Sequence, residues 1–96
     1  MIASEQRDAV GPVLIAGPVA EAVVAAIQEL NGDVTVIDRG AYLRVLVRER
    51  CRLTCAAVER RTSSPFRLPA DLEMVMASFR GRMRLDEAEA IWERSR

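Results

Sequence analysis

The sequence contains no histidine and no lysine, and these two absences narrow its possible functions. Without histidine, the chain has no imidazole base, no histidine ligand for a metal and no imidazole that titrates near neutral pH. Its 14 basic residues are therefore all arginines, and 14 acidic residues balance them to a net charge of zero. A nucleic-acid-binding protein of this composition would need a strongly segregated basic face.

Cysteines and long apolar runs are also scarce. Cys51 and Cys55 form a C-x-x-x-C pair, which cannot complete a tetrahedral metal site alone in a chain without histidine. We expect one to be a buried small residue and the other to lie at a helix start, with a redox or metal role as the alternative. No run of 18 apolar residues predicts a membrane span, and residues 1–8 are unlike a secretory signal. These features predict a cytoplasmic protein with reduced thiols and no membrane contact.

The first half of the chain carries signals for a β-α-β-β unit. The apolar run 12–16 predicts a buried strand, and Pro18 begins a helix that Asn31-Gly32 ends in the left-handed conformation. The runs 34–37 and 41–48 flank a turn and predict a hairpin. In the second of these strands one face carries Leu43, Val45 and Val47, and the other carries Tyr42, Arg44, Leu46 and Arg48.

The second half repeats this order loosely. The predicted elements are a strand at 50–53, a helix at 55–61 capped by Thr54, a strand at 72–79, a returning hairpin strand at 82–85 and a last helix that begins at Asp86. We therefore expect an α+β fold in which two loosely similar β-α-β-β units form a compact single domain with antiparallel hairpins and a short C-terminal helix. Residues 1–9 are expected to be a flexible N-terminus, and residues 10–96 the domain.

No group of residues predicts catalysis. The acidic residues are scattered, no base lies beside Ser63 or Ser64, and the five glycines form no phosphate-binding loop. The arginines are more informative, because they cluster along the runs 44–52 and 80–84. Such arginines can protect exposed strand edges, meet carboxylates of a partner protein or bind nucleic acid. A reader of single strands would want more aromatic stacking platforms than the 4% aromatic content offers.

Several motifs, taken in order, resemble a known family. They are Val10-Gly11-Pro12, then Asp38-Arg39-Gly40-Ala41-Tyr42, then Ala77-Ser78-Phe79-Arg80-Gly81, followed by the segment that begins at Asp86. The chain resembles, over residues 10–93, the small effector (coupling or regulatory) subunits of bacterial soluble diiron multicomponent monooxygenases. The toluene and phenol hydroxylase branch is the most similar. The methane branch has a long N-terminal tail, whereas only about ten residues precede the first predicted strand here, so we expect an aromatic or alkene branch.

This resemblance implies a subunit without metal or cofactor that catalyses nothing alone. It implies that the chain binds a diiron hydroxylase and modulates its active site, turnover, coupling and regiospecificity in the monooxygenation of aromatic or alkene hydrocarbons. It further implies that a Rieske ferredoxin or a reductase can compete for an overlapping surface. We expect a monomer when the chain is free, since an effector must expose its docking face.

The expected docking residues lie on the hairpin 38–48 and the strand 74–80. Asp38, Arg39 and Tyr42 follow the family-like motif, whereas strand alternation selects Arg44, Met74, Met76, Ser78 and Arg80. For each of them a purely structural role is the alternative, and a core position is a strong rival for Tyr42. The competing function is an α+β nucleic-acid or regulatory binding module that uses the arginine-lined hairpins.

Overall fold

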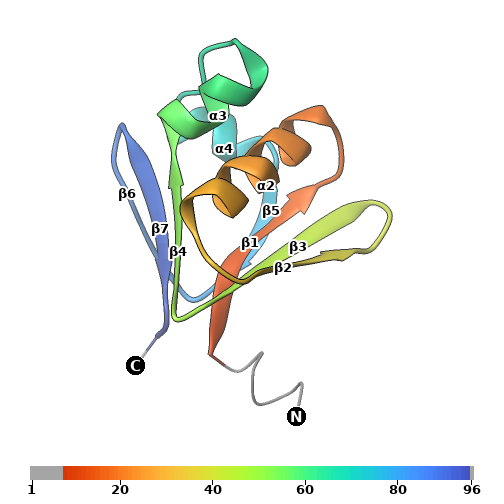
Figure 1. The fold of residues 1–96 in the computed structure, drawn as a ribbon, viewed down its shortest axis with the longest axis vertical. Helices are drawn as coiled ribbons and strands as arrows, with labels where there is room; N and C mark the ends of the chain where they lie inside the picture. The colour runs from red at the N-terminus through yellow and green to blue at the C-terminus, as the bar shows by residue number, and fades with distance from the viewer. Residues whose placement is uncertain (1–7, 96) are drawn as a thin grey trace.

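Two antiparallel sheets and three helices make up residues 8–95, the part of the chain that the computed structural model describes (Figure 1). Sheet A has the strand order β2-β3-β1-β5, and sheet B has the order β4-β7-β6. The strands are β1 (Ala9–Ile15), β2 (Val34–Asp38), β3 (Tyr42–Arg48), β4 (Arg50–Thr54), β5 (Met76–Arg80), β6 (Arg82–Leu85) and β7 (Glu89–Glu93), and the helices are α2 (Pro18–Leu30), α3 (Cys55–Thr62) and α4 (Ala70–Glu73). The expected α+β fold is confirmed, with several changes in the second half.

The β-α-β-β unit of the first half is present as predicted. β2 and β3 pair antiparallel along their whole lengths, and β1 lies on the other side of β3. β1 begins earlier than predicted, because Ala9 is buried and pairs with Arg48. The expected flexibility of residues 1–9 is thus wrong for Ala9, and residues 1–7 lie outside the described residues.

A proline lies at the start of helix α2, and an asparagine side chain satisfies its end. Pro18 occupies its first turn, where the missing N–H removes no helical hydrogen bond. The predicted left-handed ending at Asn31 is wrong, because Asn31 is extended, with φ −131° and ψ 151°. Its side-chain Nδ2 instead donates to the carbonyls of Ile27 (2.7 Å) and Arg52 (2.9 Å), and its Oδ1 accepts the Arg52 N–H (3.0 Å). One amide therefore satisfies the end of α2 and pairs with the edge of β4.

The chain passes between the two sheets at two corners. Glu49 (φ 70°) separates β3 from β4, and Gly81 (φ 102°) separates β5 from β6. A Cβ on Gly81 would lie 2.6 Å from the Glu93 carbonyl oxygen and 2.7 Å from Val10 Cγ1. Glycine is required at this corner both by the backbone conformation and by the close approach of β7 and β1.

The segment predicted as one strand at 72–79 is divided. Residues 70–73 form the short helix α4, which buries Leu72 completely, and β5 begins at Met76. The expected hairpin between this strand and 82–85 is also wrong. β5 pairs with β1 in sheet A, whereas β6 pairs with β7 in sheet B, so Gly81 is a corner rather than a hairpin turn.

The predicted C-terminal helix is a strand. β7 lies at the centre of sheet B and pairs with β4 on one side and β6 on the other. Asp86 behaves as a helix cap would, since its Oδ1 accepts the N–H groups of Ala88 (2.8 Å) and Glu89 (2.9 Å), but a turn follows instead of a helix. Burial of Ala90, Ile91 and Trp92, together with two strand partners, outweighs the helix-start signal.

One hydrophobic cluster joins both sheets to all three helices. It includes Leu14 and Val45 of sheet A, Trp92 of sheet B, Ile27 of α2 and Leu72 of α4. The predicted cap of α3 is confirmed, because Thr54 Oγ1 accepts the Ala57 N–H at 3.1 Å. Among the described residues, no helix is long and apolar enough to cross a membrane. The cluster places the helices on one side of sheet A (Figure 1), which leaves its opposite side free of helices from residues 8–95.

Candidate docking surface

The side of sheet A that faces away from the helices, called the outer face, carries both apolar and arginine side chains. Alternation along each strand assigns residues to it, because Leu14, Val45 and Val47 point into the core on the other side. The outer face carries Thr35, Ile37, Tyr42, Arg44, Leu46, Arg48, Val13, Ile15, Ser78 and Arg80.

The strand register aligns these side chains in rows across the sheet. One row crosses all four strands, from Ile37 to Arg44, then to Val13 and to Ser78. In the neighbouring row Tyr42 lies opposite Ile15, and these two large side chains are 45% and 47% exposed. Cross-strand neighbours of this kind form a continuous surface. The outer face therefore presents exposed apolar area beside a central arginine.

The charge of the outer face is entirely positive. The four strands of sheet A contain a single carboxylate, Asp38, and its Oδ1 accepts the Gly40 N–H at 2.8 Å in the hairpin turn. For Arg44, Arg48 and Arg80, no carboxylate of residues 8–95 lies within 4.0 Å. Moreover, the covered Nε of Arg44 has no hydrogen-bond partner in that part of the chain. A buried donor without a partner is destabilising by about 1–3 kcal/mol.

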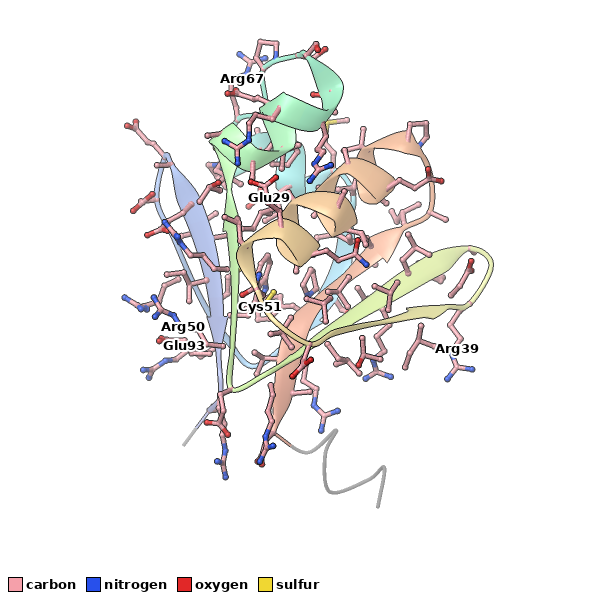
Figure 2. The ribbon with its side chains drawn as sticks, in the orientation of Figure 1. Glu29, Arg39, Arg50, Cys51, Arg67 and Glu93 are labelled. Carbon is pink, nitrogen blue, oxygen red and sulfur yellow. The ribbon has the colours of Figure 1, made fainter. Side chains whose placement is uncertain are left out.

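Three arginines of sheet B lie close to carboxylates, unlike those on the outer face of sheet A. Arg52 bonds Glu89 (2.8 Å), and Arg84 bonds Glu93 (3.0 Å), to which Arg50 also lies close (3.9 Å; Figure 2). These acidic and basic residues sit on adjacent strands, so each guanidinium meets a carboxylate across the ladder. The outer side of sheet B is thereby largely neutralised from within.

A second neutralised cluster joins two helices. Arg60 and Arg61 of α3 both bond Glu29 of α2, which lies between the helices in Figure 2. The hydrogen bond from Arg60 is the main cause that holds the pKa of Glu29 below its ordinary value, with Arg61 acting in the same direction. These surface pairs position the helices and contribute little stability each.

The two cysteines do not form a reactive pair. Cys51 is fully buried, and this burial raises the pKa of its thiol to about 12. Cys55 begins α3 and its Sγ lies 3.3 Å from the Glu87 carbonyl oxygen; burial and then Glu59 raise its pKa. Both thiols are free, as expected. Within residues 8–95, no three His, Cys, Asp or Glu side chains are grouped to hold a metal ion.

Comparison with known proteins places this geometry in a family. The model of the MmoB/DmpM family matches residues 8–93. The chain belongs to the MmoB/DmpM family. A relative from Xanthobacter autotrophicus (strain Py2), named the effector subunit of an alkene monooxygenase system, is 42% identical over 85 residues, which is 86% of this chain and 83% of the relative. The resemblance inferred from the sequence motifs is thereby confirmed.

The fold is that of a solved member of a hydroxylase complex. A chain in the structure of a phenol hydroxylase–regulatory protein complex superposes with a TM-score of 0.80 at 16% sequence identity, covering 91% of this chain and 98% of that one. At this level of identity the match supports the fold alone.

The structure brings together half of the residues expected to dock. Tyr42, Arg44, Ser78 and Arg80 share the outer face. Asp38 and Arg39 lie at the end of the β2–β3 hairpin, where Arg39 extends from the molecule in Figure 2. Met74 precedes β5 and is 78% exposed, but Met76 packs against the core.

Sequence reasoning missed the apolar half of this face. Val13 and Ile15 belong to a continuous apolar run that predicted a buried strand, yet Ile15 is half exposed. The sequence placed Ile37 in the hairpin but did not predict on which side of the sheet its side chain lies. The signal that could have found them is the register of the hairpin with the first strand, which only the fold supplies.

Proposed function

We propose that this chain is a non-catalytic effector subunit that binds a diiron hydroxylase and modulates its turnover, coupling and regiospecificity. The observation that carries this proposal is the family match over residues 8–93, together with the 42% identity to a protein named as an effector subunit. The same match favours this function over a nucleic-acid-binding module. An outer face that is apolar and positively charged suits a protein that works in contact with a partner.

The effector acts by differential binding. It shifts the hydroxylase toward an active conformation only if it binds that conformation more tightly than the resting one. A tenfold change in the population ratio requires about 1.4 kcal/mol of differential affinity. A scaffold of two sheets around one core loses little conformational entropy on docking, so more of the contact energy is available for this discrimination.

The docking region includes Asp38, Arg39, Tyr42, Arg44, Met74, Ser78 and Arg80. Met76 remains in the region as a support rather than a contact, because its side chain packs against the core.

The hydroxylase substrate is an aromatic or alkene hydrocarbon, and the substrate pocket lies in the hydroxylase rather than in this chain. A Rieske ferredoxin or reductase competes for part of the same surface, and the free effector is a cytoplasmic monomer.

Reconstitution tests this function. The chain is titrated into its cognate diiron hydroxylase with reductase, and both product formation and NADH consumption are measured. We expect a saturable rise in turnover and in the ratio of product to NADH. Genes for a hydroxylase, a ferredoxin and a flavin reductase beside that of the chain would identify the partner. An unchanged rate and coupling at saturating chain would contradict the proposal.

A matched pair of variants connects the effect to the docking region. Arg44→Glu reverses a charge on the outer face, whereas Arg67→Glu reverses one in an exposed loop whose only ion pair within residues 8–95 is weak, at 4.0 Å from Asp71. At limiting effector, Arg44→Glu should lose most of the stimulation and Arg67→Glu should retain it. Equal losses in two folded variants would move the docking region elsewhere.

A further inference from the structure

The ion pairs of the chain separate its arginines into two groups. The arginines that meet carboxylates within residues 8–95 include Arg50, Arg52 and Arg84 of sheet B, Arg60 and Arg61 of α3, and Arg67 of the loop before α4. Arg82 of sheet B meets none there. The arginines of the outer face of sheet A, Arg44, Arg48 and Arg80, meet none among residues 8–95. Within residues 8–95, sheet B thus pairs three of its four strand arginines with carboxylates, whereas the outer face of sheet A pairs none of its three.

We propose that the outer face of sheet A docks onto a hydroxylase surface that carries carboxylates around an apolar centre. This inference rests on the proposed function and specifies the chemistry of the partner. Arg44 and Arg80 each take a partner carboxylate, and Ile15 with Tyr42 fills the apolar centre. The apolar pair lies in the row next to Arg44, so both kinds of contact form at once.

Arginine suits this role because of its shape. Its planar guanidinium can bind a carboxylate through two parallel N–H groups, and its weak hydration makes it tolerant of a desolvated interface. The covered Nε of Arg44 lacks an acceptor within residues 8–95. A carboxylate that docks against this row, with a change in the Arg44 rotamer, provides the missing acceptor. Docking therefore satisfies a donor that residues 8–95 leave unpaired.

The area of the sheet indicates how far the interface extends. Four strands about 4.8 Å apart, each presenting about five residues at 3.3 Å per residue, give a flat footprint of roughly 300 Å². A stable interface buries about 800 Å² on each partner. The contact therefore continues beyond the strands, onto the hairpin end at Arg39 and onto Met74, which is the most exposed large apolar residue of the described chain.

Binding measurements with conservative variants test the carboxylate contacts. The dissociation constant of the complex with the cognate hydroxylase is measured for the wild type, Arg44→Gln, Arg80→Gln and Arg44→Lys at low and physiological salt. Losing one partner of a desolvated charge pair weakens binding by about 30-fold or more. We expect that loss for both Gln variants, a partial recovery for Arg44→Lys, and a weaker salt dependence in the Gln variants than in the wild type.

Arg82→Gln is the matched control. Arg82 is an exposed strand arginine on sheet B, also without a carboxylate within 4.0 Å among the described residues, so the same change removes the same charge from the other sheet. Its affinity should stay within about threefold of the wild type. Thermal unfolding of every variant checks that the fold is retained.

The possible results distinguish a failure of this inference from a failure of the proposed function. If the wild type binds and stimulates while both outer-face variants bind as tightly as Arg82→Gln, the face is wrong and the function stands. If the wild type neither binds nor stimulates its hydroxylase, the function fails and the inference fails with it. A third result would overturn both: the chain does not bind the hydroxylase but binds a single-stranded oligonucleotide in a salt-sensitive way, and the Gln variants lose this binding. The partner would then be a nucleic acid rather than a protein.

Discussion

Substituting Gly81 with alanine tests the corner that joins the two sheets. The residue adopts φ 102°, and the new Cβ would approach the Glu93 carbonyl oxygen to 2.6 Å and Val10 Cγ1 to 2.7 Å. The backbone strain destabilises by about 1–3 kcal/mol, and overpacking against β7 and β1 by about another 1–3 kcal/mol. We expect a total loss near 4 kcal/mol, a large part of the roughly 5–14 kcal/mol available to a domain of this length.

Two glycines provide controls that separate strain from overlap. Gly40 has φ 80° and open space around it, so Gly40→Ala should lose only the left-handed strain of about 1–2 kcal/mol. Gly32 lies outside the left-handed region with nothing nearby, so Gly32→Ala should be neutral or stabilising by up to about 1 kcal/mol. Urea unfolding followed by the fluorescence of Trp92, the single and fully buried tryptophan, measures all three. A Gly81→Ala protein as stable as Gly40→Ala would refute the packing described for this corner.

Three further substitutions or treatments give distinct signatures. Cys51, whose pKa is about 12, should resist alkylation by iodoacetamide at pH 8 until urea is added, while Cys55 reacts slowly in the native state, as mass spectrometry can show. The backbone N–H groups of residues 88 and 89 hold the pKa of Asp86 below its ordinary value of 3.8, so its contribution to stability is present above that pH and is lost as the pH falls through the lowered pKa. Asp86→Asn should therefore flatten the fall in thermal stability below about pH 4. Asn31→Ala removes three hydrogen bonds at the α2–β4 junction and should destabilise by about 1–3 kcal/mol in urea unfolding.

The first half of the fold was predictable because its signals are local. A proline at the start of α2 and β-branched residues beside an Asp38-Arg39-Gly40 turn each specify structure within a few residues. The end of α2 was not predictable from local signals, because the side chain of Asn31 bonds the backbone of Arg52, which lies 21 residues further along the chain. The role of a side chain that bonds two elements cannot be predicted from the sequence of either element alone.

The C-terminal segment was predicted wrongly for a related reason. A segment of five residues such as 89–93 fits a helix turn and a strand almost equally well. Sheet B decides between them, because β7 must lie between β4 and β6 to complete the ladder. Its partner β4 is about 40 residues away in sequence, which no local pattern reports.

The candidate docking surface was half predictable. Alternation in the hairpin placed Tyr42 and Arg44 on one face correctly, because β3 is regular. The same reasoning put Met76 with Ser78, but a bulge shifts the register of β5 between Val13 and Leu14, and Met76 pairs with Leu14 on the core side. A two-residue periodicity holds only as far as the ladder is unbroken.

The zero net charge of the chain does not describe the field that a partner meets. Sheet A carries Arg44, Arg48 and Arg80 against one carboxylate, so its outer face is locally positive although the total cancels. The molecule measures 40 × 28 × 22 Å, whereas charges in physiological salt are screened over about 8 Å. Within residues 8–95, no carboxylate lies within 4.0 Å of these three arginines, so none pairs with them directly. Association of the outer face with an acidic surface should depend on salt even though the effector as a whole is neutral.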